Sequence, residues 1–343
     1  MKFGSCSDCG KYKYLPNVTK CRSCLPDTVW NAGDNTLLIG GIATGKTVTM
    51  KQHLIRTLDK TEQKVYVIDP IGAYDDLKSS YKTSEIKINK NSRLDILRNP
   101  SFISNHLVVE KMIEESNNTP VSSLLKHRIK KHVNETKKDT FSDIKVRLKN
   151  TARAGSSRRK QEKLDRKLRK NIQVFEDTIH DSARNLNLKT DTQFNVINID
   201  VNATSTSMFS IFNAIYMEIQ SAENESIVVF DHATKPVNSS YLRLVSKYLN
   251  TVPQNVSFSF VTSNLSFLKL ADAREFMRQF DTKLCFKVKG TYHSKFYRYE
   301  NIGKTDKRYL ESNMKTGECL LQESQRWKRG SIVLNNREKS IIN

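Results

Sequence analysis

Eight residues, GGIATGKT at positions 40–47, have the types and the spacing that bind nucleotide phosphates. They fit the pattern GxxxxGK[ST] and lie between an apolar segment, TLLIG, and a segment with apolar residues at helical spacing. In this pattern backbone N–H groups curve around the phosphates at the positive end of the following helix. The lysine reaches the β- and γ-phosphates, and the threonine ligates Mg²⁺. The sequence therefore predicts a nucleoside triphosphate site made by Gly40, Gly41, Ile42, Ala43, Thr44, Gly45, Lys46 and Thr47.

Such a site needs a carboxylate at the end of a second strand to organise Mg²⁺, and three apolar segments end in one. They end at Asp69 (VYVID), Asp200 (VINID) and Asp231 (SIVVFD). Asp231 fits best, because residues 227–230 form the continuous apolar run of a central parallel strand that is covered on both faces. We expect Asp231 and Thr47 to hold Mg²⁺ and Asp69 to lie at the nucleotide site. The alternative for Asp69 and Asp200 is an aspartate that only caps a turn.

Four cysteines at the N-terminus have the spacing of a zinc site. They form CxxC, eleven intervening residues, and a second CxxC, a spacing that allows two short knuckles to place four thiolates around one Zn²⁺. The alternative is a pair of disulfides, which a chain kept in a reducing compartment would not form. The predicted zinc ligands are Cys6, Cys9, Cys21 and Cys24. Cys285 and Cys319 lie in apolar segments and are expected in the core.

Composition points to an intracellular protein with a polyanionic partner. The 343 residues include 57 Lys and Arg against 36 Asp and Glu, a formal charge of +21. No stretch approaches the roughly 18 apolar residues of a membrane span, and the first residues lack the apolar core of a signal peptide. We therefore expect a cytoplasmic protein without a membrane span, and nucleic acid is the natural partner for its charge.

Much of the positive charge lies in one segment. Residues 126–189 hold 20 Lys and Arg against 8 Asp and Glu, a net charge of +12. Leu125, Ile129 and Val133 recur every four residues, as do Leu164 and Leu168, so each run predicts a helix with one apolar stripe. We expect a basic helical hairpin that contacts DNA phosphates without reading sequence, double-stranded DNA being favoured because aromatic residues are few. The alternative is an insertion that contacts protein.

Four segments together resemble the HerA/FtsK superfamily of DNA-pumping ATPases, which includes conjugative type IV secretion ATPases and viral genome-packaging ATPases. These segments are the loop at 40–47, VIDPIGAYDDL at 67–77, VVFD at 228–231 and FSFVTSNLSFL at 258–268. The likeness covers about residues 36–97 and 193–322. It implies a RecA-like core that binds ATP at the subunit interfaces of a homo-hexameric ring, with DNA in the central channel. The partners of such pumps would include portal, capsid or secretion-channel proteins, in the host cytoplasm if the chain is viral.

The residue after the best strand-end carboxylate departs from that family. His232 stands where the family usually has an acidic residue that polarises the attacking water. A neutral imidazole can accept a proton, but it lacks the fixed negative charge that orients water beside Mg²⁺. The sequence therefore predicts ATP binding with slow hydrolysis, as in a divergent member from a virus or mobile element.

Two further positions differ from the family pattern. Ala73 stands where the family often has glutamate, and Asp75 and Asp76 follow closely enough to substitute for it. In the segment at 258–268, Asn264 or the neighbouring Ser263 matches a polar glutamine. Asn264 is the candidate for a hydrogen bond to the γ-phosphate or the water.

A ring ATPase also needs a cation that is supplied across the interface. Arg274 and Arg278 in ADAREFMRQF are the candidates, because a spacing of four places both on one helix face. The alternative is a solvated helix face without a role.

Three classes of function remain: a DNA-translocating motor, a non-motor ATP-binding switch or assembly factor, and a small-substrate phosphotransferase. The motor uses the ring, ATP and the basic surface together, and the switch is favoured by His232. In a phosphotransferase neither the zinc knuckle nor the basic hairpin would have a purpose. We expect an α/β, RecA-like core with a mostly parallel sheet over residues 31–110 and 190–335. A zinc-binding knuckle over 1–30 and a basic helical insertion over 111–189 complete the expected architecture.

Overall fold

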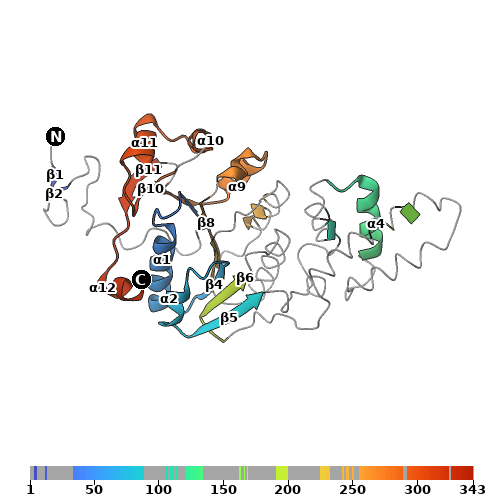
Figure 1. The fold of residues 1–343 in the computed structure, drawn as a ribbon, viewed down its shortest axis with the longest axis horizontal. Coiled ribbons are helices and arrows are strands. Elements are labelled where there is room, and N and C mark those ends of the chain that lie inside the picture. Colours follow the sequence, from blue (N-terminus) through green and yellow to red (C-terminus); the bar gives the residue numbers. More distant parts are fainter. Residues whose placement is uncertain are drawn as a thin grey trace. The chain divides into compact units, whose positions relative to one another are not determined.

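The computed structural model describes most of the expected core and less of the rest of the chain (Figure 1). The described residues are 34–88, 120–133, 191–199, 225–231, 255–263, 265–288, 292–323 and 326–342, with 4–5, 12–13 and isolated positions between these ranges. The chain divides into two compact units. The first comprises Met1–Glu85, Asp191–Asn198 and Glu223–Asn343, and the second comprises Ile86–Thr190 and Ile199–Ala222.

The strands of the described core form one sheet of nine, in the order β11-β10-β9-β3-β8-β7-β4-β6-β5. Parallel pairing runs from β9 through β3, β8, β7 and β4 to β6, whereas β10 is antiparallel to both β9 and β11. The predicted mostly parallel α/β core is therefore confirmed. The strands are β3 Thr36–Ile39, β4 Lys64–Asp69, β5 Thr83–Ile88, β6 Phe194–Ile199, β7 Ser226–Asp231, β8 Val256–Thr262, β9 Thr282–Cys285, β10 Glu318–Glu323 and β11 Arg326–Ser331.

One long helix, α1, follows β3, and the other helices of the core are short. Their bounds are α1 Lys46–Lys60, α2 Asp75–Lys78, the 3₁₀ helix η3 Ser266–Lys269, α9 Ala273–Arg278, α10 His293–Tyr299, α11 Lys304–Arg308, the π-helix η4 Tyr309–Asn313 and α12 Asn336–Ile341. Near the N-terminus, β1 Gly4–Ser5 pairs antiparallel with β2 Tyr12–Lys13. None of the helices in the described part of the chain is long and apolar enough to cross a membrane.

The central strands β3, β7 and β8 are buried on both faces, as their continuous apolar sequences predict. Val229 and Val261 belong to the core cluster that includes Leu54 of α1. The residues adjacent to these valines, Phe230 after Val229 and Phe260 before Val261, face the other side of the sheet, where their rings stack with centroids 4.8 Å apart. Phenylalanines from α9 and the residues after it meet Phe260 edge-on, which closes this second face. The sheet is therefore a rigid platform for the loops at its strand ends.

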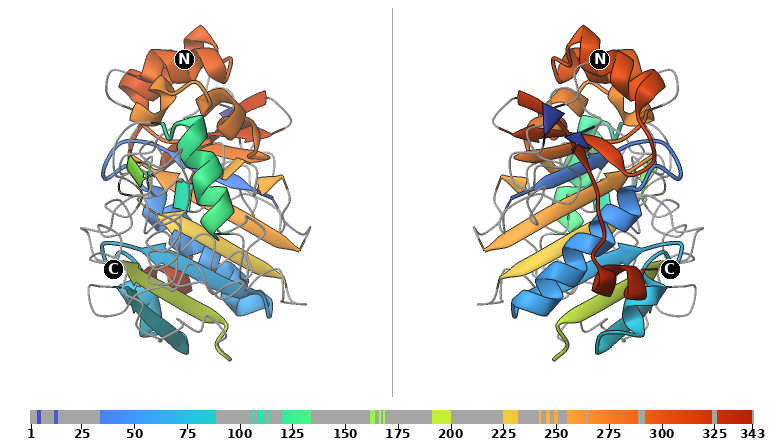
Figure 2. Two further views of the ribbon diagram at one scale, coloured as in Figure 1. Left: turned by 90° about the vertical axis from the view of Figure 1, so that its right-hand side faces the viewer. Right: turned by 90° about the vertical axis from the view of Figure 1, so that its left-hand side faces the viewer.

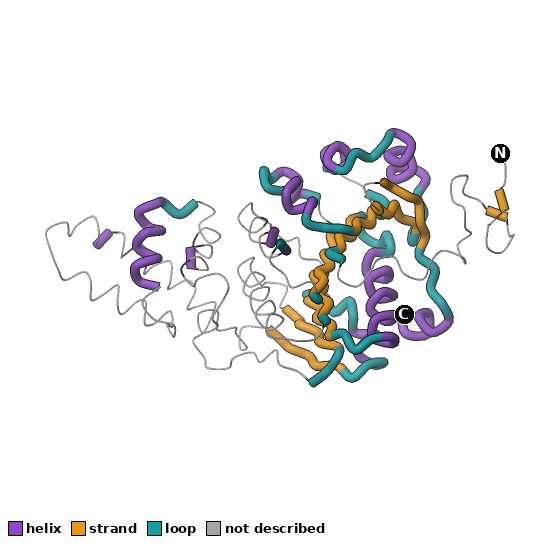
Figure 3. The backbone as a smooth tube through the Cα atoms, turned by 180° about the vertical axis from the view of Figure 1, so that it is seen from behind, coloured by secondary structure: helices purple, strands orange, loops and turns teal. Residues whose placement is uncertain are grey.

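Helix α1 covers one face of the sheet and is joined there by the C-terminal helix α12 (Figures 2 and 3). The buried carboxylate of Glu338 in α12 accepts hydrogen bonds from Gln52, 2.8 Å, and Arg56, 2.5 Å, of α1. It also accepts the backbone N–H of Asn335, whose side chain caps the N-terminus of α12. Arg337 adds an ion pair with Asp59 at the end of α1. These contacts fix the C-terminus against the helix that follows the phosphate-binding sequence.

The second unit contains α4 Ser123–Val133, which is the first helix that the sequence predicts in the basic segment. Leu125 and Ile129 of its apolar stripe are buried, and Lys126 pairs with Glu110 of the same unit. The predicted partner helix of the hairpin lies mostly outside the described residues, although Leu168 is buried.

Candidate functional site

The candidate site lies at the edge of the sheet where the parallel strands end. The loop at 40–45 connects the end of β3 to the first residue of α1, so it has the strand-loop-helix context that the sequence pattern requires. Strands β4 and β7 end at this same edge with Asp69 and Asp231. In open parallel sheets ligands bind outside the carboxyl ends of the strands.

The loop adopts a tight conformation that depends on two glycines. Gly45 has φ 102°, and a Cβ there would lie 3.3 Å from the backbone of Gly317, so the position suits glycine alone. A Cβ on Gly40 would lie 2.6 Å from Cβ of Phe286. Two backbone hydrogen bonds attach the loop to segments that are distant in the sequence. The Gly41 N–H donates to the Lys287 carbonyl at 2.7 Å, and the Gly317 N–H donates to the Thr44 carbonyl at 3.2 Å.

Lys46 is hydrogen-bonded to the loop, and the residue at the tip of the loop is exposed. The Lys46 Nζ donates to the Gly41 carbonyl at 2.5 Å, and the side chain of Thr44 donates to the same carbonyl at 2.8 Å. Burial lowers the pKa of Lys46 to about 8, and Asp231 partly opposes this effect by attraction. Ala43 has a positive φ of 57°, and Ile42 at the tip is 87% exposed. The cation and the backbone groups of residues 40–47 thus lie around one small loop.

Asp231 brings the loop and the central strand together. The Thr47 hydroxyl donates to Oδ2 of Asp231 at 3.1 Å, and the Tyr74 hydroxyl donates to the same oxygen at 2.9 Å. Asp231 and Tyr74 are both fully buried. Burial, reinforced by Asp231, raises the pKa of Tyr74 well above its usual value, so this phenol stays protonated. The hydroxyl of Thr47 and the carboxylate of Asp231 are hard oxygen donors in contact, which fits a Mg²⁺ ion bound beside a nucleotide.

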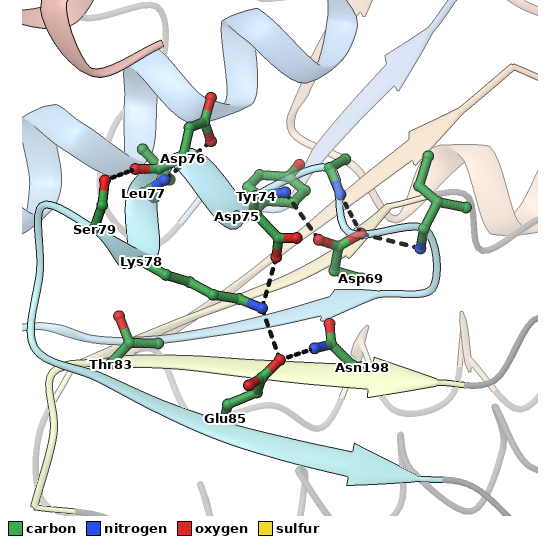
Figure 4. A network of polar contacts seen from close by, with 12 residues as sticks. Asp69, Tyr74, Asp75, Asp76, Leu77, Lys78, Ser79, Thr83, Glu85 and Asn198 are labelled. Atoms are coloured by element: carbon green, nitrogen blue, oxygen red, sulfur yellow. Dashed lines mark hydrogen bonds and ion pairs between the residues drawn. The ribbon is translucent and has the colours of Figure 1, made fainter. Parts of the chain in front are cut away.

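Asp69 organises the loop that carries Tyr74 (Figure 4). Its Oδ1 accepts the backbone N–H groups of Ile71 at 3.2 Å and Ala73 at 2.9 Å, and its Oδ2 accepts that of Tyr74 at 2.9 Å. Asp69 therefore does what the turn-capping alternative describes, at the strand end beside Asp231. Both roles are compatible, since the loop it shapes carries the residue that contacts Asp231.

The carboxylates that could substitute for a glutamate at position 73 are each held by a lysine. Asp76 pairs with Lys51 of α1, and both side chains are largely buried. Asp75 is 65% exposed and pairs with Lys78 at 2.6 Å, which also contacts Glu85 at 2.8 Å. Figure 4 shows this second network running from α2 to the neighbouring strands.

The structure describes some of the other predicted residues and not the rest. Arg274 and Arg278 lie on α9, four residues apart, and both are exposed. Cys285 and Cys319 are buried, as expected, and neither forms a disulfide. No cluster of three or more metal-binding side chains occurs among the described residues. The predictions that lie outside those residues concern Cys6, Cys9, Cys21, Cys24, Asp200, His232 and Asn264.

Sequence reasoning missed two parts of the site. The contact of Tyr74 with Asp231 joins residues 157 positions apart, and the only signal for it was the place of Tyr74 in the DPIGAY segment. The packing of Gly317 behind the phosphate-binding loop had no local signal, because Gly317 belongs to the turn before β10.

Solved structures of other proteins share this fold. VirB4 of Thermoanaerobacter pseudethanolicus is 14% identical with a TM-score of 0.73, over 91% of this chain and 94% of that one. The bacterial conjugative coupling protein TrwB is 11% identical with a TM-score of 0.57, over 89% of this chain and 86% of that one. The genome packaging NTPase B204 from Sulfolobus turreted icosahedral virus 2 is 10% identical with a TM-score of 0.44, over 89% of this chain and all of that one.

At these identities the likeness to VirB4 and TrwB shows a shared fold, and that fold agrees with the one that the motifs led us to expect. No protein-family model matches the sequence, and no curated protein matches it significantly.

Proposed function

We propose that this chain is a DNA translocase-type ATPase that binds ATP and Mg²⁺ at the loop of residues 40–47 and uses hydrolysis to move DNA. The observation that carries the proposal is the hydrogen bond between Thr47 of the loop and Asp231 of β7. It places the hydroxyl and the carboxylate that a P-loop ATPase uses in direct contact, at the strand ends where ligands bind. The general fold of VirB4 and TrwB supports the same class of activity.

Each residue of the site has a defined task in this proposal. Lys46 and the backbone N–H groups of the loop bind the phosphates, and the positive end of α1 lies beside them. Thr47 and Asp231 hold Mg²⁺, which neutralises phosphate charge when it is bound. Asn264 hydrogen-bonds the γ-phosphate or the water, and His232 accepts the proton of the water.

The proposed motor is a homo-hexameric ring with ATP at the subunit interfaces and double-stranded DNA in the channel. Arg274 or Arg278 supplies the interfacial cation, since both are exposed on α9. The basic segment 126–189, with a net charge of +12, contacts phosphates without reading the bases. The zinc knuckle over residues 1–30 binds DNA or a partner such as a portal, capsid or secretion-channel protein.

A second candidate is a non-motor switch or assembly factor that binds ATP and hydrolyses it weakly. The observation that favours it is His232 in the place of the usual catalytic carboxylate. Such a protein would use the same contacts to Thr47 and Asp231 for binding, and it would change partner affinity with nucleotide state.

Steady-state phosphate release by the full chain separates the two candidates. Turnover is measured with and without linear double-stranded DNA, at low and at raised salt, because phosphate contacts weaken as salt increases. We expect DNA to increase turnover at low salt and the increase to diminish at high salt. ATP binding with little or no turnover under every condition would favour the switch. Rapid turnover that is indifferent to DNA would contradict both and indicate an enzyme of another kind.

A further inference from the structure

The Tyr74 side chain is the feature of the site that the proposed function does not require. It is fully buried, and its hydroxyl donates to the same Oδ2 of Asp231 that accepts the Thr47 hydroxyl, at 2.9 Å and 3.1 Å. One carboxylate oxygen is therefore shared between the loop of residues 40–47 and the loop that follows β4. Two donors on one oxygen fix the direction in which a carboxylate faces more firmly than one donor does.

The backbone of Tyr74 is itself anchored to the sheet. Its N–H donates to Oδ2 of Asp69 at 2.9 Å, while Oδ1 of Asp69 accepts the N–H groups of Ile71 and Ala73 (Figure 4). Asp69 is the last residue of β4, and β4 pairs with β7 up to the residue before Asp231. Tyr74 therefore links the end of β4 to the end of β7: its backbone N–H is bound by Asp69, and its hydroxyl is bound to Asp231.

We propose that Tyr74 is a positioning residue for the magnesium–nucleotide site, whose hydroxyl holds the Asp231 carboxylate in the orientation that serves Mg²⁺ together with Thr47. The inference rests on the proposed function, because it names the residue that prepares the same site. Tyr74 is assigned no contact with ATP or with the ion. Residues that orient a metal ligand in this way typically change metal affinity by about 10- to 100-fold when they are altered.

The test compares Tyr74→Phe with the wild-type full chain. The substitution removes one oxygen and keeps the buried ring, so the packing against the core is retained. Equilibrium binding of the fluorescent, non-hydrolysable analogue mant-AMPPNP is measured while Mg²⁺ is titrated, and again in EDTA. We expect the Mg²⁺ concentration at half-maximal binding to rise about tenfold or more, with binding in EDTA unchanged. A tyrosine with a purely structural role would lower the melting temperature without moving the Mg²⁺ midpoint.

Tyr81→Phe is the matched control. The Tyr81 hydroxyl also donates to a carboxylate, Oδ1 of Asp59 at 2.8 Å, but this pair lies at the far end of α1 from the phosphate-binding loop. The Tyr81→Phe variant loses the same kind of hydrogen bond as Tyr74→Phe. We expect the Mg²⁺ midpoint of Tyr81→Phe to stay within about twofold of wild type. An equal shift in both variants would overturn the proposal, because it would show a general effect of stability.

A second variant keeps the test decisive if Tyr74→Phe does not fold. Asp69→Asn retains one acceptor oxygen and removes the other, which loosens the anchor of Tyr74 and leaves its hydroxyl in place. The expected result is a smaller rise in the Mg²⁺ midpoint, and a wild-type midpoint in either folded variant would overturn the proposal. Failure of the wild-type chain to bind mant-AMPPNP with Mg²⁺ would instead refute the proposed function, so the two failures are distinguishable.

Discussion

Replacing Gly40 with alanine tests whether close packing sets the shape of the phosphate-binding loop. A Cβ at this position would lie 2.6 Å from Cβ of Phe286, 2.9 Å from Oγ1 of Thr44 and 3.4 Å from Cα of Phe286. The Cβ of Phe286 is fixed to its backbone, so no side-chain rotation relieves the contact. Comfortable carbon–carbon separation is about 3.5–4.0 Å, so the loop must move by roughly 1 Å.

The cost of Gly40→Ala can be approximated from that displacement. Overpacking of a tight site costs about 1–3 kcal/mol, which corresponds to a fall in melting temperature of roughly 2–12 °C for a core of this size. A shift of the loop also misaligns phosphate donors, and losing one charge-assisted hydrogen bond at about 1.5–3 kcal/mol weakens binding by roughly ten- to a hundredfold. We expect both effects in circular dichroism melts and in titrations with a fluorescent ATP analogue.

Gly303→Ala is the control for this substitution. Gly303 precedes α11 with φ −66°, and a Cβ there meets nothing within 4 Å. Alanine is a poorer N-cap residue than glycine, which costs a little stability. Alanine also lowers the conformational entropy of the unfolded chain, which stabilises the folded state by about 0.4–1 kcal/mol, so the two effects offset each other and stability should hardly change. Wild-type stability and affinity in Gly40→Ala would refute the argument that the contact with Phe286 shapes the loop.

Three further predictions concern zinc, hydrolysis and the C-terminal helix. Metal analysis of the purified chain should find about one Zn²⁺ per molecule, and Cys21→Ser should lose it without a change in nucleotide affinity; metal-free wild type would contradict this. Wild-type turnover should fall as the pH drops through about 6.5, and His232→Glu should raise turnover, whereas equal rates in His232→Glu and His232→Ala would make His232 a bystander. Burial opposes ionisation of Glu338, but its hydrogen bonds from Arg56, Gln52 and Asn335 outweigh that effect and lower its pKa below 4.5. Its stabilising effect is therefore present above about pH 4.5 and lost as pH falls through the lowered pKa, so Glu338→Gln should melt lower than wild type at pH 7 and converge with it in acid; parallel melting curves at all pH values would contradict this.

The parts of the fold that could be predicted are those with local signals. The helix after the phosphate-binding loop was expected from its apolar residues at helical spacing, and it runs over Lys46–Lys60. The strands that end at Asp69 and Asp231 are continuous apolar runs, and their shared sheet edge follows from parallel pairing. The contact between Thr47 and Asp231 could therefore be predicted from the sequence.

The remaining contacts depend on segments that are distant in the sequence. Gly317 packs behind the loop because β10 pairs antiparallel with β9, and nothing near Gly317 indicates that neighbour. The anchoring of α12 on α1 through Glu338 joins residues 286 positions apart. Such pairings are decided by tertiary packing, whose signal is not contained in a window of a few residues.

The central claim is that residues 40–47 bind ATP, and Lys46→Ala tests it most directly. The measurement is equilibrium binding of a fluorescent ATP analogue with Mg²⁺ to the full chain, with Lys60→Ala, an exposed lysine at the other end of the same helix, as the matched control. We expect Lys46→Ala to lose nucleotide binding, while its zinc content and melting temperature stay near wild type, and Lys60→Ala to bind normally. Wild-type affinity in Lys46→Ala would contradict the assignment of this loop as the nucleotide site.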